Sequence, residues 1–137
     1  MVNGVAAAGK LLLVASMALA VACGDDDDDG ASEAQQKGVG DACTSPSDCA
    51  ETAPECLSQF KSGYCGISDC TGDEDCPQGS ACVAHDDGHN YCFLVCREKP
   101  DCNHFRPADA ESNCVSSIDF VDRQPGSKAC VPPSAGD

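Results

Sequence analysis

The apolar residues of this chain are concentrated in one continuous run near its start. Leu11 to Ala22 (LLLVASMALAVA) carries no charged side chain, and Lys10 stands directly before it. A run of twelve residues is too short for a transmembrane helix, which needs about 20. It has the length of the hydrophobic region of an export signal, and small residues end it just before Cys23. We therefore predict that residues 1–22 are a signal peptide.

The rest of the chain has only short apolar segments, separated by turn residues. Two extended runs, 81–85 and 89–93, flank Asp86-Asp87-Gly88, a pattern that predicts a β-hairpin. Lys61-Ser62-Gly63 predicts the tip of an earlier hairpin in the same way. We expect short hairpins and loops, with little helix outside the signal peptide.

Composition makes cross-links necessary. The chain has no Trp, and its aromatic residues are four Phe and two Tyr. So few bulky side chains cannot bury enough apolar surface to offset the entropy of ordering the backbone. The chain also has 13 cysteines in 137 residues, a density typical of disulfide scaffolds, in which each bond contributes about 2–4 kcal/mol. The predicted fold class is therefore small and disulfide-rich.

Twelve of the cysteines form an internal repeat of about 26 residues. Each unit begins with two cysteines separated by five residues, and an aspartate (Asp48, Asp75 or Asp101) precedes the second. The repeat divides the chain into unit one (41–66), unit two (67–93) and unit three (94–133), which is stretched. In order, the cysteines are Cys43, Cys49, Cys56 and Cys65; Cys70, Cys76, Cys82 and Cys92; and Cys96, Cys102, Cys114 and Cys130.

Four cysteines allow three pairings, so three units allow 27 combinations. The third and fourth cysteines of a unit flank a predicted hairpin, and a bond between directly opposed strand residues tends to strain the disulfide. We therefore favour first-to-third and second-to-fourth bonds, while the other pairings stay open. The favoured pairs are Cys43–Cys56, Cys49–Cys65, Cys70–Cys82, Cys76–Cys92, Cys96–Cys114 and Cys102–Cys130.

The thirteenth cysteine follows the predicted signal. Ala20-Val21-Ala22-Cys23 resembles the lipobox of bacterial lipoproteins, although Leu19 stands one residue earlier than that family's favoured leucine. The resemblance implies that Cys23 is lipidated (palmitate being a usual acyl group) and becomes the new N-terminus. An odd cysteine count agrees, because lipidation of Cys23 leaves twelve that can pair completely. The alternative is ordinary cleavage after Ala22 and soluble secretion.

Residues 23–40 predict a disordered acidic tether. The segment has no hydrophobic period, and Asp25 to Asp29 repel one another and keep it extended. The whole chain has a formal net charge of −15. This charge argues against nucleic acid as a partner. A lipid-anchored chain would have the membrane as its partner, facing outward from the outer membrane or into the periplasm.

The repeat itself resembles a unit of cysteine-rich surface proteins of deltaproteobacteria, especially myxobacteria. The stretch from Cys70 to Cys82 (CTGDEDCPQGSAC) carries that resemblance. It matches unit two closely, unit one partly and unit three poorly. The Dickkopf N-terminal cysteine-rich domain is a more distant resemblance. Both imply location and architecture more than an activity.

Candidate chemistry is sparse. His85 and His89, with Asp86 and Asp87, form the densest cluster and are weak candidates for a zinc or copper site across a hairpin tip. A solvated polar tip is the favoured interpretation, and we predict no metal or other cofactor. The sequence contains no Cys-x-x-Cys, Gly-x-Ser-x-Gly or His-Glu-x-x-His motif.

These patterns favour a non-enzymatic, envelope-anchored structural or binding module, whose protein or polysaccharide ligand the sequence does not name. The alternative is a secreted or tethered protease inhibitor, because small disulfide scaffolds present rigid loops. Lys61 and Arg123 are candidate basic tips, whereas the proline after Arg106 opposes cleavage there.

Overall fold

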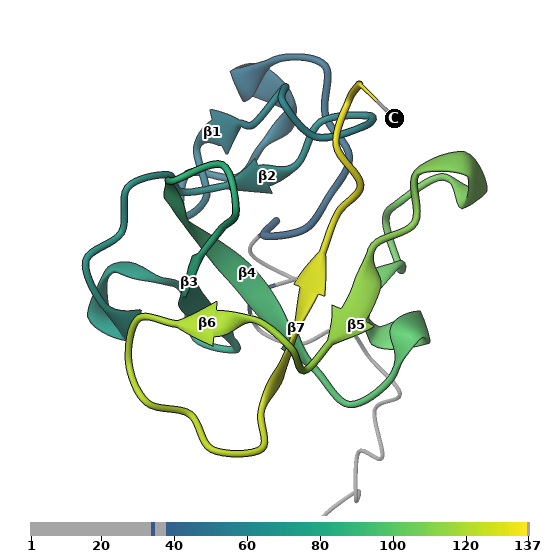
Figure 1. The fold of residues 1–137 in the computed structure, drawn as a ribbon. Helices are drawn as coiled ribbons and strands as arrows, with labels where there is room; N and C mark the ends of the chain where they lie inside the picture. Colours follow the sequence, from purple (N-terminus) through teal and green to yellow (C-terminus); the bar gives the residue numbers. More distant parts are fainter. Residues whose placement is uncertain (1–33, 35–37, 137) are drawn as a thin grey trace, which may run out of the picture.

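The computed structural model describes Ala34 and residues 38–136, which form short strands and single-turn 3-10 helices (Figure 1). The longest helical segment of this part has four residues, so the small disulfide-rich fold class is confirmed. The strands are β1 (Glu55–Cys56), β2 (Cys65–Gly66), β3 (Ser80–Ala84), β4 (Asn90–Cys96), β5 (Asn113–Val115), β6 (Asp119–Phe120) and β7 (Lys128–Val131), and the 3-10 helices are η1 (Pro46–Asp48), η2 (Asp73–Asp75), η3 (Lys99–Cys102) and η4 (Ala108–Ala110).

The signal peptide, Cys23 and most of the predicted tether lie outside the described residues. The last three residues of the predicted tether, 38–40, are described, and they belong to the folded part. Val39 is fully buried, and the Gly40 N–H donates to the carbonyl of Cys65 at 2.9 Å. The folded part therefore begins before the predicted boundary at residue 40, because Val39 supplies apolar surface to the core.

Units two and three share one antiparallel sheet. Its strand order is β5-β7-β4-β3-β6, and β4 lies at its centre (Figure 1). This strand begins in unit two and ends at Cys96, the first cysteine of unit three, so it crosses the predicted boundary at 93/94. Five of its seven residues are buried, on both faces of the sheet, which suits a central strand better than an edge. The two units therefore form one structural body.

The six disulfides stay within the units and join first to third and second to fourth cysteines, the same pairs that the sequence favours. In every unit the third and fourth cysteines lie directly opposite each other on paired strands. The two facing cysteines are thus not bonded to each other, because the third is bonded to the first and the fourth to the second. The bonds are Cys43–Cys56, Cys49–Cys65, Cys70–Cys82, Cys76–Cys92, Cys96–Cys114 and Cys102–Cys130.

The repeated aspartate closes the loop between the first two cysteines of each unit. Its carboxylate accepts hydrogen bonds from residues that directly follow the first cysteine, and these bonds hold the pKa of Asp48, Asp75 and Asp101 below the usual range. The Asp-Cys pair therefore repeats for a structural reason. The donors are the N–H and hydroxyl of Thr44, the N–H of Ser45, the N–H and hydroxyl of Thr71, and the N–H groups of Arg97 and Glu98.

One aromatic core joins unit one to the shared sheet. Phe60 and Tyr64 of unit one pack edge-on against Phe93 of β4, with ring centroids 5.7 and 5.3 Å apart. The Tyr64 hydroxyl also accepts a hydrogen bond from the N–H of Leu94. All four side chains are at most 2 % exposed. Edge-to-face pairs of this kind add about 0.5–1.5 kcal/mol each to their burial.

The end of the chain returns to unit one. Beyond β7, Pro133 accepts a hydrogen bond from the N–H of Lys61, and the Ala135 N–H donates to the carbonyl of Gln59. Phe60 and Ser134 form a further β-bridge. The last described residues therefore cover the first hairpin (Figure 1).

A buried arginine makes several polar contacts between units three and one. Arg106 is 8 % exposed, and its guanidinium carbon lies 5.5 Å from the ring centroid of Tyr64. The guanidinium donates to four backbone carbonyls, three of which belong to residues N-terminal to unit two. They are those of Ala110 at 2.8 Å, Gly40 at 3.3 Å, Gly63 at 2.9 Å and Lys61 at 2.8 Å.

Asp41 lies near this guanidinium. Its Oδ1 atom is buried and has no hydrogen-bond partner among the described residues. Burial raises the pKa of Asp41 to about 6, against the opposing effect of the Arg106 charge. The carboxyl is thus held in a setting that favours its neutral form.

Candidate functional site

The hairpin tip between β3 and β4 carries the weak metal candidates. The N–H of His85 donates to the carbonyl of His89 at 2.8 Å, and the Gly88 N–H donates back to His85 at 3.0 Å. Gly88 has a φ of +89°, which a residue with a side chain rarely adopts. The predicted hairpin is therefore present, and its tip places both histidines next to each other in the backbone.

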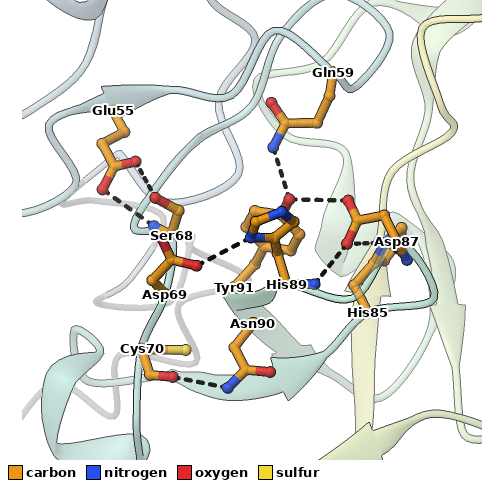
Figure 2. Close-up of polar contacts among 10 residues, drawn as sticks. All are labelled: Glu55, Gln59, Ser68, Asp69, Cys70, His85, Asp87, His89, Asn90 and Tyr91. Atoms are coloured by element: carbon orange, nitrogen blue, oxygen red, sulfur yellow. Dashed lines mark hydrogen bonds and ion pairs between the residues drawn. The ribbon is translucent and has the colours of Figure 1, made fainter.

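The two imidazoles nevertheless take different partners (Figure 2). The side chain of His85 is 17 % exposed, packs against Phe60 at 5.4 Å between ring centroids, and lies 3.3 Å from Asp87 through Nδ1. His89 is exposed, and its Nδ1 lies 3.1 Å from Oδ1 of Asp69. The hydrogen bond and the charge of Asp69 raise the pKa of His89. The His85 ring thus extends the core, whereas the His89 ring binds Asp69, which directly precedes the first cysteine of unit two.

Asp87 is held by its own hairpin (Figure 2). Its carboxylate accepts hydrogen bonds from the N–H of His89 at 3.0 Å and from the Tyr91 hydroxyl at 2.9 Å. Desolvation opposes ionisation of Asp87, but these bonds prevail and lower its pKa. The Gln59 side chain donates to the same Tyr91 hydroxyl at 3.0 Å, which connects the tip to unit one. These hydrogen bonds hold the hairpin tip of unit two against unit one, which gives the polar residues of the tip a structural role.

His85, Asp87 and His89 do not converge as a ligand set. Within the described part of the chain, three groups of three metal-binding side chains have donor atoms within 4.8 Å of one another. All three groups consist of cysteines, and every one of those sulfurs is in a disulfide. Disulfide sulfurs do not offer the thiolates that zinc requires.

The candidate basic tips differ sharply in exposure. The backbone of Lys61 forms hydrogen bonds with Pro133 and Arg106. Gly63 has a φ of +65°, and a Cβ at this position would clash with the carbonyl oxygen of Cys43. That hairpin is thus packed against its own unit. Arg106 is buried. Arg123, by contrast, is exposed in the loop 121–127, which connects β6 and β7.

Loop 121–127 is attached to unit two through Asp73, a residue that the sequence patterns did not single out. The N–H of Asp73 donates to the Asp122 carboxylate at 2.7 Å, and the Gln124 side chain donates to Oδ2 of Asp73. The only signal in the sequence is that Asp73 departs from the repeat, since the equivalent positions hold Pro46 and Lys99.

The open depressions on the surface of the described residues include two beside unit three. One, of about 450 Å³, follows this same loop, and the other, of about 390 Å³, lies beside η3. Their linings are Ile118, Asp119, Phe120, Asp122, Arg123, Gln124 and Pro125 for the first, and Lys99, Pro100, Asn103, His104 and Glu111 for the second.

No protein family, curated protein or solved structure matches this chain. In the part of the chain that the structure describes, no helix has the length and apolar character needed to cross a bilayer.

Proposed function

We propose that this protein is a cell-envelope lipoprotein, anchored through Cys23, whose folded part is a non-enzymatic structural or binding module. The observation that supports the anchor most strongly is the pairing of the cysteines. The six disulfides use twelve of the thirteen cysteines. No cysteine between residues 43 and 130 therefore remains for Cys23 to bond, which favours a separate fate such as lipidation.

The arrangement of the folded part supports a role in binding. Cross-links and a shared core fix the loops of three units relative to one another. A preorganised loop loses little conformational entropy when a partner binds, so a small scaffold of this kind gains affinity without a deep pocket. The whole chain has a formal net charge of −15, and this acidity keeps the protein soluble at a membrane surface and favours partners that are not acidic.

The anchor is tested by mass spectrometry of the N-terminus of the mature protein. We expect a chain that begins at Cys23 and carries diacylglycerol and acyl groups, and that sediments with membranes. The matched variant Cys23→Ser should be exported but released from membranes, with its six disulfides intact. An unmodified Cys23 in the exported wild-type protein would contradict the proposal and favour soluble secretion.

A further inference from the structure

Of the two candidate basic tips, Arg123 is exposed, whereas Lys61 is only partly exposed. The residues on both sides of Arg123 are held. The Asp122 carboxylate accepts from the N–H of Asp73, and the Gln124 side chain donates to the carboxylate of the same residue. The loop is therefore fixed immediately before and immediately after the exposed arginine.

The anchoring residue is itself rigidly placed. Asp73 lies in η2, between Cys70 and Cys76, both of which are in disulfides. Its Oδ1 accepts a hydrogen bond from the N–H of Cys82 at 2.9 Å. The start of the loop has a second attachment, since the Val121 N–H donates to the carbonyl of Cys82 at 2.9 Å. Unit two thus serves as a support for a loop of unit three.

The loop is also closed covalently. Cys114 precedes it and is bonded to Cys96, and Cys130 follows it and is bonded to Cys102. Hydrolysis of the Arg123–Gln124 peptide bond would add one water, giving a carboxylate on Arg123 and an ammonium on Gln124. Both new ends would stay attached to the same body through these bonds, so the cleaved loop could not diffuse apart.

From this geometry we propose that loop 121–127 binds serine proteases of trypsin-like specificity, with Arg123 in the primary specificity pocket. Such a pocket has a carboxylate at its base, which an arginine side chain meets with paired hydrogen bonds. A held loop presents the arginine without an ordering cost and is a slow substrate, whereas a loose loop is simply cut. The inference rests on the proposed role as a binding module.

The test uses the purified full-length exported protein with its disulfides intact. Trypsin is assayed with a chromogenic substrate, and chymotrypsin is assayed in parallel. We expect saturable inhibition of trypsin, with slow cleavage confined to the Arg123–Gln124 bond. Arg123→Ala should weaken inhibition by at least about 30-fold, as for a central interface residue. Arg123→Lys should still inhibit trypsin, and Arg123→Phe should move inhibition to chymotrypsin.

Two further variants separate the loop from the general fold. Arg97→Ala removes another exposed arginine of unit three, outside the loop, and should inhibit as the wild type does. Gln124→Ala removes one attachment to Asp73 and should speed cleavage at Arg123. The proposal is overturned if trypsin cuts the wild-type loop rapidly without being inhibited, or if Arg97→Ala and Arg123→Ala behave alike.

The anchor and the inhibitor are tested independently. Cys23→Ser protein should inhibit trypsin as well as the lipidated form does. Failure to inhibit would therefore refute this inference and leave the anchor standing, while an unmodified Cys23 would have the opposite consequence.

Discussion

Replacement of Arg106 by alanine tests how unit three is held against unit one. The substitution removes the donors to four backbone carbonyls, which belong to Lys61, Gly63, Gly40 and Ala110. It also removes the positive charge that lowers the pKa of the partly buried Asp41. We expect the contact between the two units to weaken while all six disulfides remain.

The size of the effect follows from these contacts. A hydrogen bond to a charged group contributes about 1.5–3 kcal/mol, but four bonds from one guanidinium do not add. Loss of one partner of a buried charged cluster typically costs about 3–5 kcal/mol. We therefore expect Arg106→Ala to lower the free energy of unfolding by about 3–5 kcal/mol. Arg106→Lys should cost roughly 2 kcal/mol, because a single ammonium cannot reach the same set of carbonyls.

Unfolding in guanidinium chloride, with the disulfides intact, measures this difference. The chain lacks Trp, so the fluorescence and near-ultraviolet circular dichroism of its two tyrosines report the transition. Arg97→Ala is the matched control and should change stability by less than about 0.5 kcal/mol, as exposed substitutions usually do. A loss below about 1 kcal/mol for Arg106→Ala would refute the view that this arginine holds the units together.

Two carboxyl groups should give opposite pH dependences. Asp41 has a raised pKa of about 6 in the folded state, so its contribution to stability is complete below pH about 4 and is lost as the pH rises through 6. At pH 8, Asp41→Asn should therefore be more stable than wild type by about 1 kcal/mol, after allowance for partial exposure. This difference in the free energy of unfolding should disappear near pH 4. A difference that does not change with pH would contradict the prediction. Asp75 has a lowered pKa because it accepts bonds from Thr71, so its contribution is present above pH about 4 and is lost as the pH falls further. Asp75→Asn should lower the melting temperature at pH 7 by less than Arg106→Ala does, and equal melting temperatures of variant and wild type at pH 7 would count against the loop-closing role.

The disulfide framework could be predicted because it depends on local spacing. The hairpin signal around Asp86-Asp87-Gly88 places Cys82 and Cys92 on facing strands, and strain then disfavours a bond between them. The same argument holds for the other two units, whose third and fourth cysteines are also opposed. Because the same local pattern occurs in all three units, the disulfide pairing depends little on contacts between distant parts of the chain.

The contacts between units could not be predicted in this way. One edge of β4 pairs with β3 in the predicted hairpin, and its other edge pairs with β7. The sequence of β4 did not indicate this second partner, because strand partners depend on which edges meet after folding. The proline after Arg106 argued only against cleavage there, and no sequence pattern indicated that Arg106 is buried. Its guanidinium is buried because the carbonyls of residues 40, 61, 63 and 110 meet around it. A sequence pattern does not show which distant carbonyls come together in this way.

The connectivity of the disulfides has a consequence for biogenesis. Every one of the six bonds skips a cysteine, as Cys43–Cys56 skips Cys49 and Cys49–Cys65 skips Cys56. The export that we propose would expose the cysteines in order from the N-terminus, so an oxidase that joins thiols of the repeat as they emerge would first make Cys43–Cys49. Such a bond must be broken by thiolate attack and exchanged before unit one is native. Maturation of this protein should therefore depend on a disulfide isomerase more than on the supply of oxidant.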